Sequence, residues 1–178
     1  FEKAGAHPLL AEQAAIPDFR RIADRGNVTV FEHASTVAAL AAVREYIHTA
    51  ATITPQHLWL IADDVYDESR ENIICSHNWC RPVAKTAEDR EALIEAATSG
   101  IRQFFFGSDF APHPALLKAG SNPPAGCACY PAGPAILAAI FKGRKCLHWL
   151  ADFTSGFASI FYGQTMAASS VLTIVDEA

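Results

Sequence analysis

The chain has 178 residues, of which 51% are hydrophobic and 19% are charged, and its formal net charge is −5 at pH 7. These values are typical of one globular domain with a sizeable core and exclude a disordered chain. The negative charge and the lack of a basic cluster argue against phosphate-backbone binding, so we expect no nucleic-acid partner. No apolar run approaches the ~20 residues that a membrane span requires, so we expect no membrane partner either.

The predicted elements alternate between strands and helices. In chain order they are a helix at 18–25, a strand near 28–33, a helix at 37–47, a strand near 50–54, a helix at 86–99, a strand near 104–109, helices at 135–142 and 146–162, and a final short strand at 169–175. Ser35 or Thr36 is the expected N-cap of the second helix. Thr86 and Asp89 have the capping-box pattern at the start of the third helix.

Two long segments have no such regular pattern. Residues 58–85 are polar and irregular apart from a short strand predicted at 73–75. Residues 114–134 form a long loop rich in Gly and Pro, which in a compact domain is typical of a functional segment.

This alternation predicts an α/β fold in which crossover helices join parallel strands. Three strands, near 28–33, 50–54 and 104–109, are too few to close a barrel. The chain is therefore either the carboxyl-terminal part of a TIM (β/α)8 barrel or a small doubly wound domain. Because the chain begins with Phe1, we expect residues 1–178 to be a partial barrel domain that lacks the first barrel strands.

The five cysteines indicate reduced thiols. Cys75, Cys80, Cys127, Cys129 and Cys146 are an odd number without the density of a small disulfide-rich protein, which favours a cytoplasmic location. The spacing of Cys127 and Cys129 resembles a metal clip, but no second Cys or His pair at zinc-finger spacing accompanies it. We therefore favour free thiols over a structural zinc ion at this pair.

The segment 104–113 is the main candidate for a functional site. Three consecutive phenylalanines are typical of a strand buried on both faces, and Asp109 follows where that strand gives way to a loop. Pro112 cannot extend a helix, so His113 is expected on an irregular segment just beyond the strand. Parallel α/β folds place their chemistry at this end of a strand. The alternative is that Asp109 caps the next helix and His113 is an ordinary surface histidine.

Three separate stretches resemble class II dihydroorotases, a branch of the amidohydrolase superfamily with a TIM-barrel fold. These stretches are Val30–His33 with Ser35 and Thr36, Ala51–Leu58, and Phe106–His113. Weaker support comes from His77–Pro82 and from the loop at 126–130, and the resemblance runs from about residue 20 to residue 163. It implies that the full polypeptide is a dihydroorotase and that this chain is its carboxyl-terminal portion.

The resemblance also implies an activity and a cofactor. The family is zinc-dependent and reversibly cyclises N-carbamoyl-L-aspartate to dihydroorotate in pyrimidine biosynthesis, often as a homodimer. Its two Zn²⁺ ions are bridged by a carboxylated lysine, which has no counterpart in this sequence. The family's first-strand His-x-His pair and fifth-strand histidine have none either. We therefore expect the isolated chain to bind zinc poorly and to be incomplete as a catalyst.

Two residues match zinc ligands of the family. His33 matches the sixth-strand histidine that binds the more exposed zinc. Asp109 matches the eighth-strand aspartate that binds the more buried zinc and acts as the catalytic base and acid. Neutral imidazole and carboxylate are suitable zinc ligands, and both are expected at the carboxyl ends of strands. Without the resemblance, His33 would be interpreted as a core histidine that is bonded to the backbone.

Other residues match substrate contacts of the family. His113 matches a histidine that helps to hold the substrate carboxylate. Arg81 and the 126–129 loop, best placed at Cys127 or Ala128, match backbone contacts to the pyrimidine ring. The family usually has an apolar residue where Arg81 stands, but a contact through the backbone does not depend on that side chain.

Two alternative functions stay open at this stage. One is another member of the amidohydrolase superfamily, such as a hydantoinase or a deaminase, although Thr54–His57 and Ala111–His113 favour dihydroorotase. The other is a non-catalytic homologue that serves as a structural subunit, which the missing ligands and Arg81 suggest. His57 lies in a recognisable motif, and we expect it to be structural.

Overall fold

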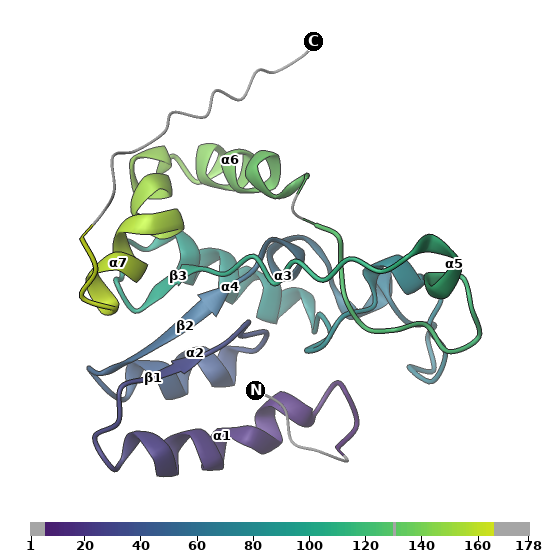
Figure 1. The fold of residues 1–178 in the computed structure, drawn as a ribbon, viewed down its shortest axis with the longest axis horizontal. Coiled ribbons are helices and arrows are strands. Elements are labelled where there is room, and N and C mark those ends of the chain that lie inside the picture. Colours follow the sequence, from purple (N-terminus) through teal and green to yellow (C-terminus); the bar gives the residue numbers. More distant parts are fainter. Residues whose placement is uncertain (1–5, 130, 166–178) are drawn as a thin grey trace.

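The computed structural model describes residues 6–129 and 131–165, and Figure 1 shows their arrangement. The final strand predicted at 169–175 lies outside the described residues. The helices and strands are α1 (Ala11–Ala23), β1 (Thr29–Phe31), α2 (Val37–Arg44), β2 (Thr49–Ile53), α3 (Pro55–Trp59), α4 (Ala87–Thr98), β3 (Phe104–Phe106), α5 (Ala115–Lys118), α6 (Gly133–Gly143) and α7 (Phe157–Phe161).

The three strands form an open parallel sheet in the order β1-β2-β3. Phe31 is in register with Ala51, and Ile53 is in register with Phe106. The predicted α/β fold with strands near 28–33, 50–54 and 104–109 is therefore confirmed. Because all strands run in the same direction, their carboxyl ends meet at one edge of the sheet.

Both faces of the sheet are covered by apolar side chains. Phe31, Ile53 and Phe104 belong to a large core that also contains side chains from α1, α2, α4 and α6. Phe105 points to the opposite face, where it packs with Ala50 and with Phe157 of α7. Successive side chains of a strand alternate between faces, so the three consecutive phenylalanines fill both sides, as their sequence predicts.

The first helix differs from its prediction. It begins at Ala11 rather than at Asp18 and continues through Pro17. Proline lacks the N–H of one helical hydrogen bond and normally ends or kinks a helix. Here Ile16 and Phe19 on either side of Pro17 are buried in the core, and this packing outweighs the local cost.

The caps of two helices agree with their sequence patterns. Thr36, rather than Ser35, caps α2, since its Oγ accepts from the N–H of Ala39 at 3.0 Å. Thr86 and Asp89 form the predicted capping box of α4. Both helices therefore begin where short polar side chains satisfy the first free N–H groups.

The irregular segments contain more structure than predicted. The 114–134 loop includes the short helix α5, and Pro55 begins α3 instead of only closing the strand before it. The strand predicted at 73–75 is reduced to one antiparallel bridge between Tyr66 and Ile73.

The helix predicted at 146–162 is divided. Its parts are a 3-10 turn at Leu147–Trp149, a π-helical turn at Asp152–Gly156, and α7. The hydroxyls of Thr154 and Ser155 donate to the carbonyls of Leu150 and Ala151 at 2.8 and 3.0 Å. Such bonds to the preceding turn are typical of bent helices.

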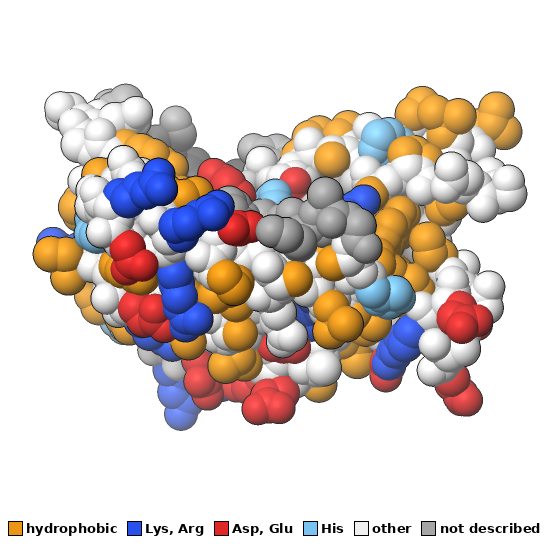
Figure 2. Space-filling model, turned by 90° about the horizontal axis from the view of Figure 1, so that it is seen from below, with side chains coloured by type: hydrophobic (Ala, Val, Ile, Leu, Met, Phe, Trp, Pro, Cys, Tyr) orange, Lys and Arg blue, Asp and Glu red, His pale blue; other side chains and the backbone are white. Residues whose placement is uncertain are grey.

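The surface on the α1 side is mixed in charge. Figure 2 shows positive and negative side chains lying beside one another over much of this face. Ion pairs such as Arg20 with Glu45 and Arg21 with Asp18 account for part of this mixture. In residues 6–129 and 131–165, no helix is both long and apolar enough to cross a membrane.

Candidate active site

His33 and Asp109 lie at the same edge of the sheet, just beyond the carboxyl ends of β1 and β3. Both have a positive φ, 43° for His33 and 41° for Asp109. This left-handed region is uncommon for residues other than glycine, and such strained residues cluster at functional sites. The structure therefore brings to one edge the two residues that we expect from the resemblance to be zinc ligands.

The imidazole of His33 is half-buried and electrically neutral. Burial lowers the pKa of His33 to about 4. Its backbone N–H donates to Thr52 Oγ at 2.6 Å, and that hydroxyl donates to Glu32 Oε2 at 2.8 Å. Among the described residues, its ring atom Nδ1 is buried and has no hydrogen-bond partner. An unpartnered ring nitrogen on a neutral imidazole suits a metal ion or a hydrogen-bond donor.

The carboxylate of Asp109 is held by a glutamine from the neighbouring strand end. Asp109 Oδ2 accepts a hydrogen bond from Gln56 Nε2 at 2.7 Å. Burial raises the pKa of Asp109, the bond from Gln56 opposes that rise, and the nearby charge of Glu32 adds to it. Asp109 does not cap the next helix, because the N-cap of α5 is Pro114. A carboxylate with a raised pKa at this edge is suited to accept and return a proton.

The segment Thr54–His57 connects the site to two loops, a role that its sequence did not reveal. Gln56 Oε1 accepts from the thiol of Cys129 at 3.0 Å, so the same amide joins Asp109 to the 126–129 loop. Burial raises the pKa of Cys129 to about 11, which keeps its thiol protonated as a donor. The signal in the sequence is that Gln56 lies in the Thr54–His57 motif, three residues after the end of β2.

His57 has the structural role expected for it. It is fully buried, with Nδ1 at 2.7 Å from Thr54 Oγ and Nε2 at 2.8 Å from the carbonyl of Pro82. Burial lowers the pKa of His57 to about 3. The neutral ring therefore donates to Pro82 and accepts from Thr54, and this fixes the segment that contains Arg81.

The two predicted backbone contacts lie in adjacent segments. The N–H of Gly126 donates to the carbonyl of Trp79 at 2.9 Å, which brings the 126–128 loop beside the segment of Arg81. The N–H of Ala111 donates to the carbonyl of Cys127 at 3.1 Å. Cys127 is buried, whereas Ala128 and Arg81 are exposed. A hollow of about 350 Å³ is lined by residues that include Gln56, Cys127 and Ala128.

His113 is exposed on the same side of the molecule as this loop. Its Nε2 lies 3.0 Å from the carbonyl of Ala125. A Cβ on Gly126, whose φ is 146°, would lie 2.9 Å from that nitrogen and 2.5 Å from the carbonyl oxygen of Ala111. Glycine at 126 therefore allows the loop to pass close to His113.

The described residues fit only part of a metal centre. His33 and Asp109 provide ligand types that zinc binds, and the free Nδ1 of His33 is consistent with that role. However, the described residues contain no group of three or more His, Cys, Asp or Glu side chains that could hold a metal ion. A complete zinc site needs three or four ligands, so further ligands would have to come from other residues.

The relatives and solved structures that resemble this chain are dihydroorotases. No family model matches the chain. It is 41% identical over 146 residues to the dihydroorotase of Coxiella burnetii, which covers 82% of this chain and 41% of that protein. It is 35% identical over 175 residues to the dihydroorotase of Saccharomyces cerevisiae, which covers 90% of this chain and 46% of that protein.

The solved structures agree with these relatives. The crystal structure of Saccharomyces cerevisiae dihydroorotase in complex with 5-fluoroorotic acid matches with a TM-score of 0.81 and 32% identity, over 93% of this chain and 47% of that one. The dihydroorotase structure from Campylobacter jejuni matches with a TM-score of 0.81 and 30% identity, over 94% and 48%. The chain thus spans less than half the length of each of these proteins.

Proposed function

We propose that this chain, a homologue of part of the dihydroorotases, is the carboxyl-terminal portion of such an enzyme. Residues 1–178 would then be one partial metal-dependent hydrolase barrel domain. The observation that carries the proposal is the homology, 41% identity over 82% of the chain with one dihydroorotase, together with His33 and Asp109 beyond the ends of β1 and β3 at one edge of the sheet. The whole polypeptide would reversibly cyclise N-carbamoyl-L-aspartate to dihydroorotate in pyrimidine biosynthesis. We further propose a cytoplasmic homodimer.

In this proposal His33 and Asp109 bind zinc. The neutral imidazole of His33 offers a ring nitrogen, and Asp109 offers a carboxylate oxygen that Gln56 orients. Bound zinc would polarise the amide carbonyl and lower the pKa of its water to about 7. Asp109 would take up a proton during attack on the amide and return it to the leaving nitrogen. The bridging lysine and the other histidines of the family would lie outside this chain.

The substrate would be held by His113 and by backbone groups at Arg81 and at Cys127 or Ala128. The hydrogen bond between Gly126 and Trp79 keeps the two backbone segments adjacent, which supports a shared ligand. Ala128 is exposed, which is compatible with a backbone contact to a ligand. A backbone contact at Arg81 is compatible with the exposure of this residue.

The test compares the chain with the same chain joined to its native upstream sequence. We expect two zinc ions per chain by elemental analysis, and turnover of dihydroorotate, only for the longer polypeptide. Asp109→Asn in the longer polypeptide is the matched control and should abolish turnover. Turnover of hydantoin in preference to dihydroorotate would instead identify another cyclic amidohydrolase. No metal and no turnover in either polypeptide would identify a non-catalytic homologue.

A further inference from the structure

Lys118 is a buried cation that none of the proposed catalytic steps uses. It ends α5, and only 3% of its surface is exposed. A lysine is rarely buried to this extent unless its charge is paired or fully hydrogen-bonded. Lys118 therefore requires a specific explanation.

The ammonium group of Lys118 donates to three backbone carbonyls. Its Nζ lies 3.1 Å from the oxygen of Trp79, 3.0 Å from that of Pro124 and 2.9 Å from that of Gly126. An ammonium has three donors and no acceptor, so these contacts use its full hydrogen-bonding capacity. Three carbonyl oxygens that converge on one point repel one another unless a cation lies between them.

These carbonyls come from the two segments that the proposed function assigns to the substrate ring. Trp79 stands two residues before Arg81, and Gly126 directly precedes Cys127. Neither segment belongs to the sheet. One backbone hydrogen bond, from Gly126 N–H to the carbonyl of Trp79, connects them. Lys118 is thus bonded to both segments at once.

We propose that Lys118 is a positioning residue that sets the separation of the 79–82 and 124–128 segments and thereby the affinity for substrate. The predicted effect on substrate affinity rests on the proposed function. Whether Lys118 holds the two segments together can be tested independently of that function. Lys118 does not touch the reacting atoms in this proposal. Its removal should therefore weaken binding while leaving the chemical step almost unchanged.

The first experiment measures amide hydrogen exchange in the 178-residue chain. In Lys118→Met we expect the N–H of Gly126 to exchange about tenfold faster or more, because its segment loses an anchor. The N–H of Ala51, which donates to the carbonyl of Gln103 in the sheet, should keep its rate. The exposed Lys145→Met is the matched control and should change neither rate. Unchanged exchange at Gly126 in Lys118→Met would overturn the joining role, whatever the enzyme does.

The second experiment uses the longer, zinc-loaded polypeptide. In Lys118→Met we expect the KM for dihydroorotate to rise about tenfold or more and kcat per bound zinc to change less than about threefold. Lys118→Arg keeps the charge and the donors but alters their geometry, so its KM should lie between those of the wild type and Lys118→Met. If Lys118→Met does not fold, the KM of Lys118→Arg decides the question.

The outcomes separate the two proposals. If Lys118→Met lowered the zinc content and the active fraction but left KM unchanged, Lys118 would have a structural role only, and the inference would be overturned. A wild-type polypeptide that lacks dihydroorotase activity would overturn the proposed function instead, and the exchange experiment would still decide whether Lys118 joins the two segments.

Discussion

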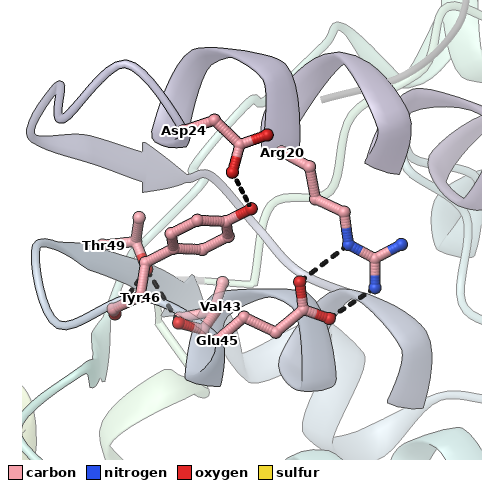
Figure 3. A network of polar contacts seen from close by, with 6 residues as sticks. All are labelled: Arg20, Asp24, Val43, Glu45, Tyr46 and Thr49. Carbon is pink, nitrogen blue, oxygen red and sulfur yellow. Dashed lines mark hydrogen bonds and ion pairs between the residues drawn. The ribbon is translucent and has the colours of Figure 1, made fainter.

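The polar side chains at the two ends of the sheet differ in how they are hydrogen-bonded. At the amino end, polar side chains pair with one another or with backbone carbonyls, as Figure 3 shows. Arg20 Nε donates to Glu45 Oε2 at 2.8 Å, and the hydroxyl of Tyr46 donates to Asp24 Oδ1 at 2.7 Å. Thr49 Oγ, at the start of β2, donates to the carbonyl of Val43 at 2.7 Å. Every side chain in this network has a partner.

At the carboxyl end, polar side chains are half-buried or buried, and one ring nitrogen has no partner among the described residues. His33 and Asp109 adopt a left-handed backbone conformation, and the Nδ1 of His33 has no hydrogen-bond partner among the described residues. Burial lowers the pKa of His33 and raises that of Asp109, so both shifts disfavour the charged forms. Such features cost stability, and proteins retain them where a ligand or a reaction uses them. The unpartnered Nδ1 and the left-handed backbone at the carboxyl end are the features for which our proposed function supplies a use.

The largest effect should follow from replacing the two proposed zinc ligands. In the longer polypeptide, Asp109→Asn and His33→Ala should each lower kcat/KM by about 10³-fold or more, because the metal site and the proton carrier are lost. In the 178-residue chain the same changes should leave the free energy of unfolding within about 1 kcal/mol of the wild type, or raise it. Urea unfolding and initial rates measure the two quantities. A large loss of stability would mean that the carboxyl end is structural after all.

The next effect concerns the buried contacts that hold the loop after His33. Glu12 is fully buried and accepts from Ser35 N–H at 2.9 Å, from Ser35 Oγ at 2.5 Å and from Thr36 Oγ at 2.6 Å. Glu12→Ala leaves these donors without an acceptor and should lower the free energy of unfolding by about 3 kcal/mol or more. Glu12→Gln, which keeps an acceptor oxygen, should cost less. Equal losses for both variants in urea unfolding would contradict this explanation.

A smaller effect is a dependence of stability on pH that comes from the carboxyl end. The folded pKa of His57 is about 3, whereas an unfolded histidine titrates near 6.5. Below pH 6.5 the unfolded chain therefore binds a proton that the folded chain rejects. As the pH falls from 6 to 4, the contribution of His57 to the free energy of unfolding should decrease by up to about 1.4 kcal/mol per pH unit. His57→Gln should reduce the slope of unfolding free energy against pH by about one proton, and an unchanged slope would argue against a buried neutral His57.

The smallest effect should follow from breaking the surface ion pair at the amino end. The side chains of Arg20 and Glu45 are 44% and 42% exposed, so solvent screens their attraction. Glu45→Gln should shift the thermal midpoint by little more than the error of measurement, and 1 M salt should make the two proteins indistinguishable. If Glu45→Gln lowered the thermal midpoint as much as Glu12→Ala does, exposed and buried contacts would not differ in their contribution to stability.

Much of the fold could be predicted from local pattern. The β-branched run before Glu32 and the apolar run at 104–106 have the composition of buried strands, and Thr86 with Asp89 marks a helix start. The start of α1 could not be predicted, because core packing around Pro17 overrides the local rule. The π-helical turn in the last predicted helix coincides with the hydroxyl bonds of Thr154 and Ser155, and such bonds to the preceding turn cannot be inferred from apolar periodicity.

The sequence by itself determined the parallel α/β fold, and its motifs identified His33 and Asp109 as the residues to examine. Residue type and position after a buried strand are local properties, so they can be inferred without coordinates. Only the tertiary structure showed that Gln56 holds Asp109, that His57 fixes the carbonyl of Pro82 and that Lys118 joins two loops. These contacts link residues far apart in the chain, and whether a buried polar group is satisfied depends on which distant atoms the fold brings to it.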